Sequence, residues 1–313
     1  LLVLDLEMPD FDGLETIKEI KARALETKIL VFTSSSKLGT ETAIEALRLG
    51  ATDFLTKPGP TDSGDPQAGM EPSQRIRASL EPKLQALFGD SPVPARNPAP
   101  KKTASKSPIW DILMPRIVVI GSSTGGPSVL EEIISQLSGP LLCPILIAQH
   151  MPPLFTTTFA ERLGKVCGIP TFEAKDGMPI QKNGIYIAPG DFHLSLCGTE
   201  KDPVAKLDQG PTRNFVRPSA DALFESAAQL FQSRCLAFVL TGMGMDGKDG
   251  AEAIKAAGGT VVIQDERSCT VFGMPGAVKA AGAFDRIATP QEIAEILLEK
   301  ATLGIGIKKV VGA

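Results

Sequence analysis

Histidine and cysteine are scarce in this chain of 313 residues, which has two histidines and five cysteines. The cysteines are far apart and form no C-x-x-C pair; they are Cys143, Cys167, Cys197, Cys235 and Cys269. This spacing argues against a zinc ribbon and against a disulfide framework. Each cysteine is better explained as a small apolar side chain that packs in the interior.

Long hydrophobic runs are also missing. The chain has no segment of about 18 apolar residues, and no basic stretch followed by an apolar one opens it. We therefore expect a cytoplasmic protein with no direct membrane insertion. With a formal net charge of −4, the chain lacks the excess of basic residues that is typical of nucleic-acid-binding proteins, so nucleic acid is not an expected partner.

An initiator methionine is absent too, because the chain begins inside the apolar stretch LLVLDL, and we expect a missing N-terminus. Residues 1–89 alternate short apolar runs with helical patterns, which predicts a βαβαβ unit and a parallel sheet. The last pattern, at 73–88, could cover one face of that sheet, although Pro82 interrupts it.

Residues 90–114 are predicted to be a linker. Most of this stretch, residues 91–108, is rich in proline, lysine, serine and alanine and has almost nothing apolar to bury. After them, apolar strands alternate with amphipathic helices over residues 115–304. This pattern predicts a second α/β domain, a doubly wound and mostly parallel sheet covered on both faces.

The segment 121–125, GSSTG, matches the G-x-S-x-G pattern directly after a strand and before a helix. In that context it is a candidate nucleophile elbow, which would present Ser123 at the carboxyl edge of the sheet. The amide of Thr124 is then placed to donate to an oxyanion. Serine and glycine loops are also common in nucleotide-binding sheets, so the pattern alone leaves both functions open.

A serine nucleophile needs a base, and the chain offers only His150 and His193. His150 follows the strand PILIAQ and should emerge at the same sheet edge as Ser123, so we predict that it is the base. His193 enters a strand after a turn, where a packed or surface imidazole is the commoner explanation. No histidine follows it, which argues against the Ser, acid, His order of ordinary α/β-hydrolases.

The acid that orients the base should also project from a strand end. Asp246 does so in the loop GMGMDG, after the apolar strand LAFVL. Alternatively, Asp246 caps the helix that begins near Asp249 or forms an Asx turn. The convergence of three strand ends on one edge favours a Ser123, His150, Asp246 triad.

Four motifs, GSSTGGP, AQHMPPLFT, LTGMGMDG and QDERSCTVFGMPGAV, together resemble the CheB family of chemotaxis protein-glutamate methylesterases. The resemblance spans nearly the whole chain. It implies hydrolysis of glutamyl γ-methyl esters, and deamidation of glutamines, on methyl-accepting chemotaxis receptors. It also implies that Ser123 is the nucleophile, His150 the base and Asp246 the orienting acid. The amides of Thr124 and Met243 would form the oxyanion hole.

The segment LDLEMPDFDG resembles the phosphoacceptor strand of flavodoxin-like receiver domains. It implies that Asp5 is phosphorylated, with a histidine kinase as phosphodonor, and that Thr33 and Lys57 sense the phosphoryl group. The receiver would be N-terminally truncated, because the first strand and helix, which carry the acidic pair for Mg²⁺, are absent. Catalysis needs no cofactor in this interpretation, and Mg²⁺ would serve phosphorylation only with the missing N-terminus present.

We also expect the unphosphorylated receiver to cover the active-site edge of the second domain. Two alternatives stay open at this stage. The second domain could be a nucleotide-binding module, although it lacks a G-K-[ST] motif. It could also be a catalytically inert docking domain, since a sequence does not establish geometry.

Overall fold

The protein is described by a computed structural model that covers residues 1–8, 11–58, 70–89 and 113–303. Its N-terminal part is a three-stranded parallel sheet in the order β1-β4-β5, as the βαβαβ pattern predicts. The strands are β1 (Leu2–Asp5), β4 (Ile29–Thr33) and β5 (Asp53–Thr56). A short hairpin of β2 (Glu7–Met8) and β3 (Phe11–Asp12), which the pattern did not predict, follows β1.

Three helices complete this part: α1 (Gly13–Ala22), α2 (Lys37–Arg48) and α3 (Pro72–Phe88). The helix α1 begins where the Asp12 side chain accepts from the amide of Leu14, a local N-cap that sequence alone can specify. The predicted helix α3 forms with Pro82 inside it, but none of its side chains is fully buried. It therefore covers the sheet only partly, and Phe88 stays exposed.

The C-terminal part contains a seven-stranded sheet in the order β14-β13-β12-β6-β7-β9-β8, and all its pairings are parallel. The strands are β6 (Ile117–Ser122), β7 (Ile145–Gln149), β8 (Thr171–Glu173), β9 (Ile185–Ile187), β12 (Cys235–Val239), β13 (Thr260–Gln264) and β14 (Arg286–Ala288). This is the predicted doubly wound parallel sheet. An antiparallel hairpin of β10 (His193–Gly198) and β11 (Pro203–Asp208) stands beside it.

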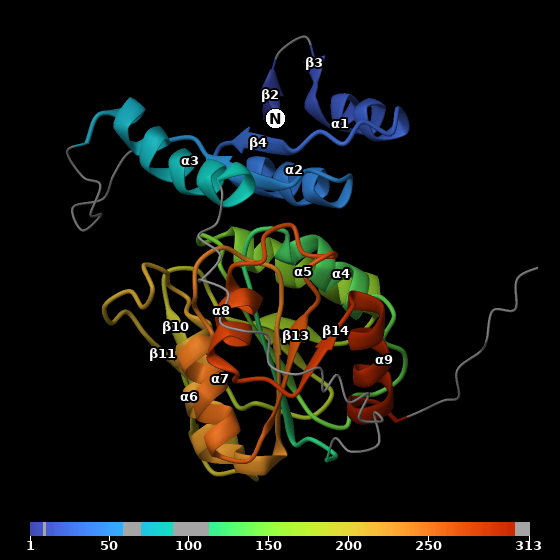
Figure 1. The fold of residues 1–313 in the computed structure, drawn as a ribbon, viewed down its shortest axis with the longest axis vertical. Helices are drawn as coiled ribbons and strands as arrows, with labels where there is room; N and C mark the ends of the chain where they lie inside the picture. Colours follow the sequence, from blue (N-terminus) through green and yellow to red (C-terminus); the bar gives the residue numbers. More distant parts are fainter. Residues whose placement is uncertain (9–10, 59–69, 90–112, 304–313) are drawn as a thin grey trace, which may run out of the picture.

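Helices cover both faces of the large sheet (Figure 1). They are α4 (Gly126–Ile134), α5 (Phe155–Cys167), α6 (Ala220–Phe231), α7 (Lys248–Ala256), α8 (Met274–Ala281) and α9 (Pro290–Ala301). Alternate residues of each central strand point to opposite faces, so two hydrophobic layers form. One layer includes α4, α5 and α9, and the other includes α6, α7 and α8.

The receiver part lies against α4 and α5, with α2 facing them (Figure 1). Its core is continuous with the layer that contains α4, α5 and α9. The rings of Phe54 and Phe155 stack across the boundary with centroids 4.3 Å apart, and Arg162 pairs with Glu45 at 3.2 Å. The predicted linker at 90–114 lies almost wholly outside the described residues. Within them, no helix is both long enough and apolar enough to cross a membrane.

Candidate active site

The elbow that carries Ser123 follows β6 directly and ends in α4. The sharp backbone turn is at Gly125, whose φ is +80°, a region that favours glycine. A Cβ at Gly125 would come within 2.3 Å of the Thr270 Oγ1. Gly121, by contrast, lies inside the strand, so the turn depends on the second glycine of the pattern.

Buried hydrogen bonds hold the elbow in place. The amide of Ser123 donates to the Thr241 carbonyl at 3.0 Å, and the Ser123 carbonyl accepts from the Gln149 Nε2 at 3.0 Å. The neighbouring Ser122 hydroxyl donates to the Gln149 Oε1 at 2.6 Å. Gln149 thus ties the end of β7 to the elbow, and the Ser123 side chain is largely buried.

His150 leaves β7 one residue after Gln149, which pairs in register with Ser122 of β6. The two strands therefore end side by side. Ser123 and His150 are the residues that come directly after the paired Ser122 and Gln149. The Nε2 of His150 lies 2.8 Å from the Asp246 Oδ2. The Nδ1 is buried and has no hydrogen-bond partner among the described residues, which leaves it as the nitrogen available to a serine hydroxyl.

The Asp246 carboxylate is held by the N-terminus of α6. It accepts hydrogen bonds from the Ser219 hydroxyl and the Ala220 amide, both at 2.6 Å. Burial raises the pKa of Asp246, but hydrogen bonds from His150, Ser219 and Ala220 lower it further than burial raises it, so the net pKa lies well below its ordinary value. The alternative role of Asp246 as a cap of α7 is wrong, because Gly247 is the N-cap of that helix.

His193 is a packed side chain, as the sequence suggested. It opens β10, is buried, and its Nε2 lies 3.0 Å from the carbonyl oxygen of Pro211. The structure therefore brings His150, and not His193, to the acid.

The loop after β12 lies directly against the nucleophile. A Cβ at Gly242 would sit 2.7 Å from the Ser123 Cβ, so only glycine permits this approach. Among the described residues, no protein group accepts a hydrogen bond from the amides of Thr124 and Met243. Both amides are therefore free to donate to a bound oxyanion.

The receiver touches this elbow. The Thr124 hydroxyl donates to the Asp53 Oδ2 at 2.6 Å, and the Lys83 ammonium group pairs with the same carboxylate. Asp53 is buried at the start of β5. The receiver is thus anchored to the residue next to Ser123, as expected of a receiver that covers the active-site edge.

The receiver's own charged site is more open. The Lys57 ammonium group lies 2.9 Å from Asp5 and 3.0 Å from Glu7. Burial raises the pKa of Asp5, but the hydrogen bonds from Lys57 and the Glu7 amide, together with the charge of Lys57, outweigh it, and the net direction is downward. Thr33 does not join this cluster, because its hydroxyl donates to the Gly39 carbonyl at 2.9 Å.

Magnesium is the metal that the receiver resemblance implies. The described residues contain no group of three or more histidine, cysteine, aspartate or glutamate side chains that could hold a metal ion. Asp5 and Glu7 are both paired with Lys57 and do not by themselves make a magnesium site.

Sequence reasoning missed the side chains that support the triad. Gln149 is the last residue of the strand β7, so its position gave no sign of a functional role, although it immediately precedes His150. Ser219 stands at the N-cap of α6, a position that the first serine of SADALF could have revealed. Its partner Asp246 follows 27 residues later, and no local pattern links the two.

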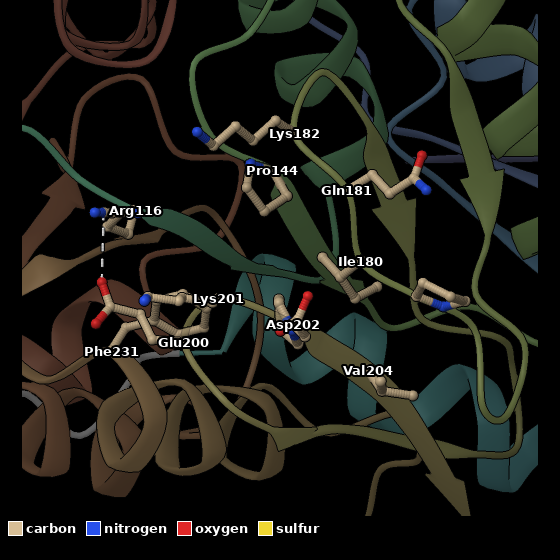
Figure 2. Close-up of a pocket in the computed structure, with 12 residues that line it drawn as sticks. Arg116, Pro144, Ile180, Gln181, Lys182, Glu200, Lys201, Asp202, Val204 and Phe231 are labelled. Atoms are coloured by element: carbon tan, nitrogen blue, oxygen red, sulfur yellow. Dashed lines mark ion pairs between the residues drawn. The ribbon is translucent and has the colours of Figure 1, made fainter.

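A cavity of about 640 Å³ lies elsewhere in the molecule, and Figure 2 shows its lining. Arg116 and Pro144 line it and immediately precede β6 and β7, so the cavity opens at the amino ends of these strands. Arg116 is paired with Glu200 at 3.4 Å. Since Ser123 and His150 lie at the carboxyl ends, this cavity is not the catalytic centre.

Comparisons with known proteins place both parts of the chain in known families. The CheB methylesterase family model matches residues 118–297, and the response regulator receiver domain model matches residues 1–63. A protein-glutamate methylesterase/protein-glutamine glutaminase of Trichodesmium erythraeum is 38% identical over 307 residues, which cover 96% of this chain and 85% of the relative. A similarly named protein of Caulobacter vibrioides is 38% identical over 301 residues, with the same coverage.

A solved structure is similar as well. The crystal structure of the Thermotoga maritima CheB methylesterase catalytic domain is 42% identical in sequence and superimposes with a TM-score of 0.55. The match covers 59% of this chain and all of that domain.

Proposed function

The chain belongs to the CheB methylesterase family, and we propose that it hydrolyses glutamyl γ-methyl esters on methyl-accepting chemotaxis receptors. The observation that carries this proposal is the pairing of His150 with Asp246 beside Ser123. A buried serine, a histidine with one free nitrogen and an ionised carboxylate are the parts of a serine hydrolase.

In the proposed reaction, the Ser123 Oγ attacks the ester carbonyl while the His150 Nδ1 accepts the hydroxyl proton. The proton then passes to the leaving methoxide, methanol departs, and a glutamyl ester of Ser123 remains. Water deprotonated by His150 hydrolyses this acyl-enzyme and releases the glutamate carboxylate. Asp246 keeps the Nε2 of His150 protonated and stabilises the imidazolium that forms.

The amides of Thr124 and Met243 would stabilise the oxyanion in both steps. The same attack on a glutamine side chain releases ammonia in place of methanol, so one site serves deamidation too. The relatives carry both activities in their names, protein-glutamate methylesterase and protein-glutamine glutaminase.

The proposed regulation runs through Asp5. A histidine kinase would transfer a phosphoryl group to this carboxylate, which adds negative charge next to Lys57 and Glu7. The existing ion pairs would then rearrange, and the docking of the receiver on Thr124 would weaken. The described residues do not by themselves form a site for Mg²⁺.

The direct test compares the full chain with Ser123→Ala in the release of methanol from membranes that carry methyl-esterified receptors. We expect turnover to fall by roughly 10⁴-fold or more, because the nucleophile is lost. The matched control is Ser135→Ala, which removes an exposed hydroxyl at the C-terminal end of α4 and should keep most of the activity. Equal turnover of native protein and Ser123→Ala would exclude the triad, and no turnover in either would favour an inert docking domain.

A further inference from the structure

A second buried carboxyl group, Asp221, lies beside the triad acid and has no part in the mechanism above. It sits in the first turn of α6 and is 1% exposed. Its Oδ1 accepts from the Gly250 amide of α7 at 2.7 Å, and its Oδ2 accepts from the Asn214 Nδ2 at 2.8 Å. The amide of Asp221 donates to the Asp246 Oδ1 at 3.2 Å.

The carboxyl groups of Asp221 and Asp246 lie near each other, because the Asn214 Nδ2 is within hydrogen-bond distance of both of them. Two carboxylates this close at a buried site do not both ionise readily, so one of them keeps a proton. Asp246 has His150 and the α6 amides as partners, and these favour its charged form. The proton therefore resides on Asp221.

The direction of the pKa agrees with this assignment. Burial raises the pKa of Asp221 to about 7, with the negative charge of Asp246 acting in the same sense and the Gly250 amide in the opposite one. Near neutral pH, the Asp221 carboxyl group is thus present both in its protonated form, a neutral hydrogen-bond donor, and in its ionised form, a second negative charge.

We propose that Asp221 is a positioning residue of the esterase, whose protonated carboxyl group donates to Asp246 and holds that carboxylate against His150. The inference rests on the proposed function. Asn214 supports the arrangement, because its amide lies between the two acids, 2.8 Å from Asp221 and 3.5 Å from Asp246. When Asp221 loses its proton, repulsion replaces the hydrogen bond and Asp246 is held less firmly.

Other charged and titratable groups surround Asp221. Lys248 and Asp249 lie on α7, Arg213 follows β11, and His150 lies on the far side of Asp246. His193 and Cys197 are the titratable groups on β10, which packs against α6. All of these remain in a variant of Asp221 alone, so the comparison with native protein isolates the one carboxyl group.

The test measures kcat for methanol release by the full chain, with saturating receptor membranes, from about pH 5.5 to about pH 9. Native protein should lose about tenfold in kcat as the pH rises through neutrality, the equivalent of one charge-assisted hydrogen bond. In Asp221→Asn this fall should disappear, because the amide N–H donates at every pH. The Asn214 carboxamide can rotate by half a turn to accept from the new amide. Asp221→Ala should have a low kcat throughout.

The matched control is Asp249→Asn, which removes a neighbouring charge that makes no hydrogen bond to Asp246, and it should keep the alkaline fall. The proposal is overturned if Asp221→Asn has the same pH profile as native protein. Because that variant is close to isosteric, the test stands even where Asp221→Ala fails to fold. Activity retained in Ser123→Ala would refute the proposed function itself, whereas an inactive Ser123→Ala with a native-like Asp221→Asn refutes only the role of Asp221.

Discussion

Two pairs of a carboxylate and a nitrogen group, one in each half of the molecule, differ in their surroundings more than in their geometry. In the catalytic half, His150 and Asp246 are 2.8 Å apart, and their side chains are 9% and 2% exposed. In the receiver half, Lys57 and Asp5 are 2.9 Å apart, and their side chains are 30% and 37% exposed. Nearly equal distances therefore accompany very different access to water.

The difference determines what each pair can do. Asp246 is fixed by donors on a helix N-terminus and is shielded from water, so it can hold a histidine in one orientation throughout a reaction. Asp5 is reached by solvent and exchanges partners at little cost, because exposed ion pairs contribute only about 0–1 kcal/mol. A catalytic acid needs the first environment, and a site of reversible modification needs the second.

Removal of the buried charge should give the largest effect. Asp246→Asn keeps the shape of the side chain, but it no longer holds the required tautomer of His150, so we expect kcat to fall by roughly 10⁴-fold. Receptor methyl-ester hydrolysis measures this loss. The control, Asp265→Asn, changes a carboxylate that follows the adjacent strand β13 and should stay within about twofold of native. If kcat of Asp246→Asn falls only slightly, burial is not what makes the His150–Asp246 pair functionally different from the Lys57–Asp5 pair.

Acid should weaken the buried pair of the catalytic half. The pKa of Asp246 is lowered on folding, so its contribution to stability is present above the unfolded value of 3.8 and is lost as the pH falls through the folded value. We expect the free energy of unfolding of native protein to exceed that of Asp246→Asn by about 2 kcal/mol near neutrality, with the gap closing below about pH 4. Urea unfolding at a series of pH values tests this. A gap that does not depend on pH would contradict it.

A smaller effect should follow from the contact that joins the halves. Asp53→Asn weakens the bonds to Thr124 and Lys83, so the receiver should leave the elbow more often. Basal turnover should rise about fivefold, as expected from the loss of one charged hydrogen bond at an interface. Glu15→Gln, on the exposed surface of α1, is the control and should leave turnover unchanged. Unaltered activity in Asp53→Asn would show that this contact does not restrain the enzyme.

Much of the fold could be predicted from sequence because its signals are local. Apolar runs separated by helical periods predicted both parallel sheets, and the two-histidine count directed attention to His150. The hairpin of β2 and β3 was missed because its strands have two residues each, too few for a period to show. The role of Thr33 in sensing a phosphoryl group stays a prediction. Its hydroxyl donates to the Gly39 carbonyl, a contact that depends on how α2 begins.

By itself, the sequence determined which residues stand at strand ends, since hydrophobic periodicity and glycine turns act over a few neighbouring residues. Only the tertiary structure decided their partners. Asp246 meets Ala220, which is 26 positions away, and Asp53 meets Thr124, which is 71 positions away. Such contacts arise when separate elements pack into one core, and hydrogen bonds together with burial then set the protonation of Asp246 and Asp221. No local pattern contains that information, because it depends on which surfaces exclude water together.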